Sequence, residues 1–166
     1  MKRRNDEKLM GSKENMHILV TGFTAFGSHA VNRTEALALA IPEVLHLEGG
    51  IHTVDVMVLD VTFQGATTVS SLVEGGSTWD LILHFGLCDS CDVLRIERIA
   101  RNELRMRIPD NDGRQVLESR IDDSGPIGTI LDVTDLSSKI PFEYSFNAGG
   151  FICNETYFHT LCALEF

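Results

Sequence analysis

Cys153 has the local sequence context of a reactive thiol. It lies in the run Asn147-Ala-Gly-Gly-Phe-Ile-Cys153-Asn154, where a glycine pair allows a sharp turn before a helical pattern begins. In the first turn of a helix, unpaired backbone amides and the helix dipole stabilise a thiolate, which makes Cys153 a candidate nucleophile. The alternative is a structural role, because free cysteine is among the residue types most often buried. The local sequence leaves both interpretations open.

Cys88 and Cys91 form a CxxC pair just after an apolar run, with His84 four residues before Cys88. Such a pair can carry redox chemistry, which predicts a reversible disulfide, or it can contribute to a zinc site. A structural zinc site needs four ligands, and this chain has a single CxxC pair. We therefore favour two small, unpaired loop residues at these positions.

Two aromatic residues follow the first apolar run, in the loop Thr21-Gly-Phe-Thr-Ala-Phe-Gly27. The loop is not a Walker phosphate-binding loop, because Ser28 and His29 follow its last glycine in place of lysine and serine or threonine. Phe23 and Phe26 on this backbone suit a small, flat, uncharged ligand. The alternative is that both rings belong to the core.

Glu97 and Arg107 are candidate charged residues in the middle of the chain. Alternation along a strand places Glu97 on the face opposite Ile96, where by itself it is typical of an exposed acid. Arg107 begins the run Arg-Ile-Pro-Asp-Asn111, a tight turn that would hold its guanidinium in place. The simpler interpretation of that run is a polar turn.

Apolar runs alternate with helical patterns along the chain. We expect strands at residues 17–21, 51–59, 79–86, 93–102 and 142–146, and helices at 32–40, 62–73 and 151–164. Asn32, with Glu35 three residues later, is predicted to cap the first helix. Strands that alternate with helices predict an α/β sandwich with a largely parallel sheet, in which active sites gather at the carboxyl ends of the strands.

The composition is that of a soluble globular domain. The chain has 166 residues, 43% of them hydrophobic and 23% charged, with a net charge of -10. The acidic balance argues against a nucleic-acid partner, and no apolar run approaches the roughly 20 residues of a membrane span. We expect residues 1–15 to be a disordered tail and not a signal peptide, and residues 16–166 to be a single domain. The cysteine pattern indicates a reducing cytoplasm.

Several short motifs occur in a fixed order. They are Thr21-Gly-Phe-x-x-Phe-Gly27 with Asn32, Gly86-Leu87, Ile96-Glu-Arg-Ile-Ala-x-Asn102, Arg107-Ile-Pro-Asp-Asn-x-Gly113, Gly125-Pro126 and Asn147-Ala-Gly-x-Phe-x-Cys-Asn154. Together they resemble the pyroglutamyl peptidase I family, also called pyrrolidone-carboxylate peptidases, over about residues 18–161. The resemblance implies a three-layer α/β sandwich of the phosphorylase/hydrolase-like type, with a mostly parallel or mixed sheet and helices on both faces.

The resemblance also implies an activity and roles for the matched residues. The family removes N-terminal pyroglutamate from peptides by cysteine-protease chemistry, needs no metal or cofactor, and often assembles as dimers or tetramers. The catalytic residues that it implies are Cys153 as nucleophile, Glu97 as the triad carboxylate and Arg107 close to the cysteine. The substrate-binding residues that it implies are Phe23, Phe26, Phe151 and Asn32. Because pyroglutamate is a neutral lactam, we expect rings to sandwich it and backbone groups to bind its amide.

One element of the family pattern has no match. The family's general base is a histidine on a strand beyond the cysteine helix, and the sequence ends before that strand. His159 follows Cys153 by six residues, which places it about 240° around a helix and about 9 Å along it, too far for a hydrogen bond. We therefore expect a C-terminally incomplete member of the family with weak or absent catalysis. The alternative is an inactive relative that acts as a binding or assembly module.

Overall fold

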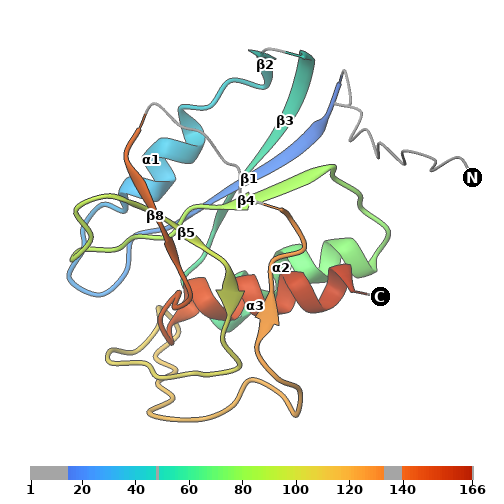
Figure 1. The fold of residues 1–166 in the computed structure, drawn as a ribbon. Helices are drawn as coiled ribbons and strands as arrows, with labels where there is room; N and C mark the ends of the chain where they lie inside the picture. The colour runs from blue at the N-terminus through green and yellow to red at the C-terminus, as the bar shows by residue number, and fades with distance from the viewer. Residues whose placement is uncertain (1–14, 48, 133–139, 166) are drawn as a thin grey trace, which may run out of the picture.

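A four-stranded sheet organises the computed structural model, which describes residues 15–47, 49–132 and 140–165 (Figure 1). The strand order is β2-β3-β1-β4, with β1 at His17–Phe23, β2 at Val44–Leu47, β3 at Gly50–Leu59 and β4 at Leu81–His84. β1 runs parallel to both β3 and β4, whereas β2 pairs with β3 in the antiparallel direction. The carboxyl ends of β1, β3 and β4 therefore lie at the same edge of the sheet.

The central strand β1 is buried on both faces. Ile18, Leu19 and Val20 are 4%, 0% and 2% exposed. Leu19 packs with Leu59 in one core cluster, whereas Ile18 and Val20 pack with Val54 in another. Successive side chains of a strand point to opposite faces, and a continuous apolar run is typical of a strand that is covered on both.

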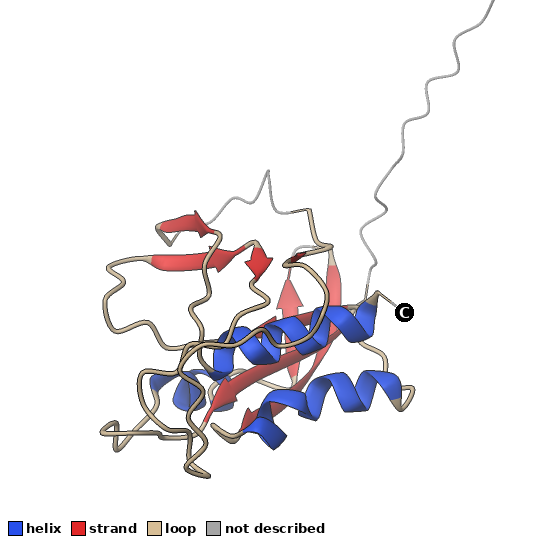
Figure 2. Cartoon of the chain, turned by 90° about the horizontal axis from the view of Figure 1, so that it is seen from below, coloured by secondary structure: helices blue, strands red, loops and turns tan. Residues whose placement is uncertain are grey.

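Helices cover the two faces of the sheet and complete three layers. One face packs against α1 through Ala38, and the other packs against α2 through Val69 and against α3 through Ile152. Figure 2 shows α2 and α3 side by side in front of the sheet. The helix bounds are Arg33–Leu39 for α1, Phe63–Glu74 for α2 and Ile152–Leu164 for α3. This arrangement confirms the predicted α/β sandwich with a mixed sheet.

The first two helices begin at side-chain caps. The Asn32 side chain accepts a hydrogen bond from the N–H of Thr34, as the sequence predicts for the start of α1. The Thr62 side chain accepts one from the N–H of Gly65 at the start of α2. Both caps are local features, which is why the starts of these helices could be found in the sequence.

Two short sheets and a long loop form the rest of the described chain. β5 (Leu94–Glu97) pairs with β8 (Phe142–Ser145) in parallel, and β6 (Ile99–Ala100) pairs with β7 (Ile127–Gly128) in the antiparallel direction. This part rests on α3 through a third core cluster that includes Ala100 and Phe158.

The structure divides the strand predicted at residues 93–102 at Arg98. The N–H of Arg98 donates to Ser145 at 2.7 Å, whereas its carbonyl accepts from the N–H of Thr129 at 2.9 Å. The chain therefore leaves the β5–β8 sheet and enters the β6–β7 sheet within one residue, a long-range pairing that the local pattern does not contain. β2 was also not predicted, because most of this edge strand is exposed and it lacks a buried apolar run.

Several expectations lie beyond the described residues. Residues 1–14 are outside them, so the disordered tail stays a prediction, as does the single domain over residues 16–166. Among the helices described in this structure, none has the length and apolar character that spanning a membrane requires.

Candidate active site

Cys153 is the second residue of α3, and its side chain faces the segment that follows β4. A Cβ atom on Gly86 would lie 3.1 Å from the Cys153 sulfur, so glycine gives the sulfur the room it needs. The backbone of Leu87 hydrogen-bonds the sulfur and favours the thiolate, but burial has the larger effect and raises the pKa of Cys153 to about 11. The thiol is therefore protonated near neutral pH, unlike the thiolate that its helix position alone predicts.

Two of the predicted ring residues form an aromatic wall next to the cysteine. The ring centroids of Phe26 and Phe151 are 5.6 Å apart, with a tilt of 39° between the ring planes. Both rings and Cys153 pack against the same core cluster. Phe23 is 1% exposed within that cluster and supports the wall from behind. Because Phe26 and Phe151 contact each other, they form one continuous surface. That aromatic rings sandwich the lactam stays a prediction.

Glu97 is the last residue of β5, and it forms hydrogen bonds with one residue that precedes Cys153 in the sequence and with one that follows it. Its carboxylate accepts a hydrogen bond from the N–H of Asn147 at 3.1 Å. Its backbone carbonyl accepts one from the Tyr157 hydroxyl of α3, also at 3.1 Å. Within the residues described, no hydrogen bond joins the Glu97 carboxylate to Cys153 itself. Glu97 is thus placed to position the cysteine segment.

Arg107 begins a loop that packs against the loop carrying Phe26. The Asn111 side chain donates to the carbonyl of Ala25 at 2.9 Å. The Ile108 side chain lies so close to Gly27 that an added Cβ there would be 2.8 Å from it. Arg107 is exposed and directly precedes Ile108 in this loop.

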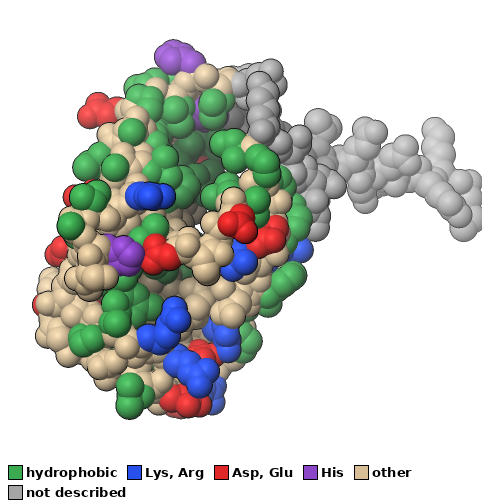
Figure 3. All heavy atoms as spheres, turned by 90° about the vertical axis from the view of Figure 1, so that its left-hand side faces the viewer, with side chains coloured by type: hydrophobic (Ala, Val, Ile, Leu, Met, Phe, Trp, Pro, Cys, Tyr) green, Lys and Arg blue, Asp and Glu red, His purple; other side chains and the backbone are tan. Residues whose placement is uncertain are grey.

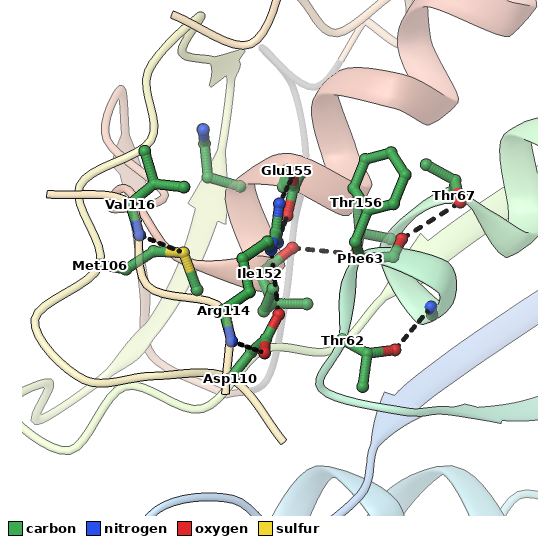
Figure 4. Close-up of polar contacts among 12 residues, drawn as sticks. Thr62, Phe63, Thr67, Met106, Asp110, Arg114, Val116, Ile152, Glu155 and Thr156 are labelled. Carbon is green, nitrogen blue, oxygen red and sulfur yellow. Dashed lines mark hydrogen bonds and ion pairs between the residues drawn. The ribbon is translucent and has the colours of Figure 1, made fainter. Parts of the chain in front are cut away.

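An ion pair that we did not predict joins the Arg107 loop to the cysteine helix (Figure 4). Arg114 donates two hydrogen bonds to Glu155, at 2.9 and 2.5 Å, and its Nε donates to Asp110 at 3.0 Å. Glu155 is 1% exposed and follows Cys153 by two residues. The hydrogen bonds to Glu155 raise the pKa of the Arg114 guanidinium above the usual range of arginine. The sequence feature that could have indicated this ion pair is Glu155 itself, a carboxylate in the otherwise uncharged first turns of α3.

The predicted substrate residue Asn32 has a structural role. It is 1% exposed; its Nδ2 donates to the carbonyl of Thr24 at 3.1 Å, and its Oδ1 accepts from Thr34. Its polar groups are thus enclosed in the loop after β1, where they have partners that the sequence pattern does not show. Asn32 therefore shapes that loop, and the direct substrate contact implied by the resemblance stays a prediction.

All six histidines lie in the described residues, and none of them has a hydrogen bond to Cys153 or Glu97. His84 lies between Thr21 and Thr160, with nitrogen-to-oxygen distances of 2.7 and 3.1 Å, and burial lowers its pKa to about 4. The Nε2 of His159 is buried without a hydrogen-bond partner in the described part of the chain. The other four are His17 beside Asp55, His29 beside Asp89, His46 on β2 and His52, which accepts from the N–H of Met16.

Cys88 and Cys91 form a disulfide, so our preference for unpaired loop residues was wrong. A turn, in which the N–H of Cys91 donates to the carbonyl of Cys88, brings their Cα atoms to 5.5 Å, within the range that a disulfide spans. Asp89, between them, pairs with His29 at 3.2 Å. The loops after β1 and β4 thus lie side by side, at the left of Figure 1.

The face that carries these loops has side chains of both charges. Figure 3 turns it toward the viewer and shows hydrophobic side chains spread over it, with acidic and basic side chains next to one another in its lower part. Neighbouring charges of opposite sign weaken the field that either would produce alone. Within the described residues, no group of three or more His, Cys, Asp or Glu side chains is placed to hold a metal ion.

Comparisons with known proteins agree on one family. The family model for pyroglutamyl peptidase matches residues 16–165. A pyrrolidone-carboxylate peptidase of Staphylococcus aureus (strain Newman) is 29% identical over 151 residues, covering 87% of this chain and 69% of the relative. Solved structures of pyrrolidone carboxyl peptidase from Pyrococcus furiosus match with a TM-score of 0.78 at 28% and 29% identity, covering 89% of this chain and 73% of theirs. Together with the fold, these matches show that the chain belongs to the pyroglutamyl peptidase family.

Proposed function

We propose that this protein is a cysteine peptidase that removes N-terminal pyroglutamate from peptides, with Cys153 as its nucleophile. The observation that carries the proposal is the position of the Cys153 sulfur. It lies at the start of α3, against Gly86 and the backbone of Leu87, and packs on the same core cluster as the aromatic wall. A thiol, a backbone hydrogen-bond donor and an apolar surface therefore meet at one place in a chain of this family.

The aromatic wall suits the ring of the substrate. Pyroglutamate is a flat, uncharged lactam, so it can lie against Phe26 and Phe151 without bringing a charge to them. An N-terminal glutamine carries an ammonium group, and removing that charge from water at an apolar surface is unfavourable. Selectivity for the cyclised residue follows from this difference.

The reaction transfers the pyroglutamyl group first to sulfur and then to water. The Cys153 thiolate attacks the carbonyl carbon, and the resulting oxyanion is stabilised by a backbone donor such as the N–H of Leu87. The Cys153 thiol gives its proton to solvent before the attack, and the peptide amine takes a proton from solvent as it leaves. Water then cleaves the thioester, which releases pyroglutamate and restores the Cys153 thiol. Glu97 positions the segment before Cys153 through the N–H of Asn147, and Arg107 supplies positive charge at the neighbouring loop.

Ionisation of the Cys153 thiol controls the rate in this proposal. Burial raises its pKa to about 11, and no described histidine bonds the sulfur, so the thiolate is a minor species at neutral pH. Below the pKa, the thiolate fraction rises about tenfold for each pH unit, and only the thiolate is a strong nucleophile. We therefore expect slow turnover at neutral pH that rises steadily with pH up to about 10.

Hydrolysis of a fluorogenic pyroglutamyl amide at increasing pH tests this function. The wild-type chain is compared with Cys153→Ala and with Cys162→Ala, which removes the other free thiol. We expect activity to disappear in Cys153→Ala and to persist in Cys162→Ala. Equal rates in wild type and Cys153→Ala would reject Cys153 as the nucleophile, and a maximum near neutral pH would reject the proposed control by thiol ionisation.

A second candidate function is binding of pyroglutamyl peptides without turnover. It is favoured because, among the described residues, no histidine hydrogen-bonds Cys153. Titration calorimetry with a pyroglutamyl peptide and its N-terminal glutamine counterpart separates the two candidates. Selective binding without hydrolysis supports the binding function. If the protein neither binds nor hydrolyses the pyroglutamyl peptide, both the peptidase function and the binding function are rejected. Assembly into dimers or tetramers stays a prediction.

A further inference from the structure

We propose that the Cys88–Cys91 disulfide is a redox-sensitive modification site that controls access to Cys153 and takes a dithiol reductant as its reaction partner. The inference rests on the proposed role of Cys153, but its first readout does not require peptidase activity. Two separate connections link the disulfide loop to the site, one through the backbone and one through side chains.

The backbone connection is direct. Leu87, whose backbone hydrogen-bonds the Cys153 sulfur, immediately precedes Cys88, and Gly86 lies against the same sulfur. A disulfide that closes a short loop limits the conformations available to that loop. The Cys88–Cys91 bond therefore restrains the segment that contacts the thiol.

The side-chain connection passes through Asp89 inside the disulfide loop. Its carboxylate lies 3.2 Å from Nε2 of His29. The His29 ring lies 5.1 Å from the Phe26 ring between centroids, and the backbone N–H of His29 donates to the Phe26 carbonyl at 3.0 Å. Phe26 in turn contacts Phe151 in the aromatic wall. The loop that the disulfide shapes thus also supports the proposed substrate surface.

The disulfide is accessible for thiol–disulfide exchange. Cys88 is exposed and Cys91 is partly exposed, and exposed disulfides are typical of the labile, regulatory class. A thiolate of the reductant attacks one sulfur, the S–S bond breaks, and a mixed disulfide forms. The second thiol of the reductant then attacks that bond. Two electrons and two protons pass to Cys88 and Cys91, which become thiols, while the reductant becomes a disulfide.

We expect the oxidised loop to hold the site closed and ordered, and the reduced loop to relax. Relaxation lets water and small reagents reach Cys153, which increases its reactivity. It also displaces the backbone of Leu87, and misplaced groups at a reaction centre lower turnover. Reduction should therefore raise the alkylation rate of Cys153 and lower the peptidase rate, two changes in opposite directions.

Alkylation with iodoacetamide, measured for each cysteine by peptide mass spectrometry, tests the inference on the intact protein. The samples are the diamide-oxidised and dithiothreitol-reduced wild type, Cys88→Ser/Cys91→Ser, and Cys162→Ser as the matched control. We expect Cys88 and Cys91 to be protected only in the oxidised form, and Cys153 to react about tenfold faster when the loop is reduced or replaced. Asp89→Asn, which keeps the disulfide, should give a smaller increase.

Two results would overturn the inference: Cys88 and Cys91 that stay alkylatable after oxidation, or a Cys153 rate that is the same in all loop states. These results are independent of the peptidase assay. A change in Cys153 reactivity without any hydrolysis would retain the redox control and reject the proposed function. Hydrolysis with an unchanged Cys153 rate would retain the function and reject the redox control.

Discussion

The main sheet and the loops of the candidate site are held together by different interactions. In the sheet, β1 contributes side chains such as Leu19 and Phe23, which are 0% and 1% exposed and pack against helices. The site loops are held by buried polar side chains that bind their backbone. Asn154 of α3, which is 0% exposed, accepts from the N–H of Arg101 and donates to the carbonyls of Arg101 and Glu103.

This difference follows from the backbone of each region. Strands satisfy their own N–H and carbonyl groups in a ladder, so their side chains can be apolar. An irregular loop has no ladder, and its backbone groups need side-chain partners when they are buried. Apolar packing has no preferred direction, whereas hydrogen bonds do, so the polar contacts are what place the loops around Cys153.

Leu19→Ala should give the largest loss of stability, because it opens a cavity in the centre of the sheet. We expect a decrease of about 3 kcal/mol in the free energy of unfolding, measured by urea denaturation. Leu39→Ala is the matched control, since Leu39 is 64% exposed, and should change it by less than about 0.5 kcal/mol. Similar losses in the two variants would contradict the assignment of the core.

Glu155→Gln tests the polar contacts of the site loops at the buried ion pair between Glu155 and Arg114. The substitution keeps the shape of the side chain but leaves Arg114 without its main partner, which should cost about 2–3 kcal/mol. Glu118→Gln, on an exposed loop, is the control. A double-mutant cycle with Arg114→Met should give a coupling energy above about 1 kcal/mol. A coupling near zero would mean that Glu155 and Arg114 do not interact in solution.

His84 links the two regions, because it lies on β4 and bonds Thr160 on α3. Its pKa is lowered to about 4 in the folded state, from 6.5 in the unfolded chain. The stabilising contribution is thus complete above pH 6.5 and is lost as pH falls toward 4, by at most about 3 kcal/mol. Urea denaturation at several pH values should show this loss in wild type and a weaker one in His84→Gln. The same acid dependence in both proteins would exclude His84 as its source.

Arg95→Ala should have the smallest effect, although it also removes an ion pair of the site region. Arg95 and Glu143 bridge β5 and β8 at 2.6 Å, but their side chains are 40% and 49% exposed. Water screens such pairs, so we expect a loss below about 0.5 kcal/mol. The melting temperature of Arg95→Ala should match that of wild type within a few degrees. If Arg95→Ala lowers the free energy of unfolding as much as Glu155→Gln does, then burial does not explain the difference in strength between the exposed Arg95–Glu143 pair and the buried Arg114–Glu155 pair.

The features that were predicted correctly depend on residues close together in the chain. The cap at Asn32 and the buried strand β1 follow from neighbouring residue types, and so does the helix start at Cys153. The helix start by itself favours a thiolate at Cys153, whereas burial raises the pKa of the thiol. The helix start is local, but the burial that raises the pKa comes from the segment after β4, far away in the sequence.

The sequence by itself determined the helices and the buried strands of the main sheet, the α/β class and the family, because periodic apolar runs and ordered motifs are present in the order of the residues. Only the tertiary structure decided that Phe23 and Asn32 are enclosed and that Arg114 pairs with Glu155. Burial and pairing depend on which distant segments approach one another. They set the protonation of Cys153 and the shape of the aromatic wall, on which the proposed chemistry depends.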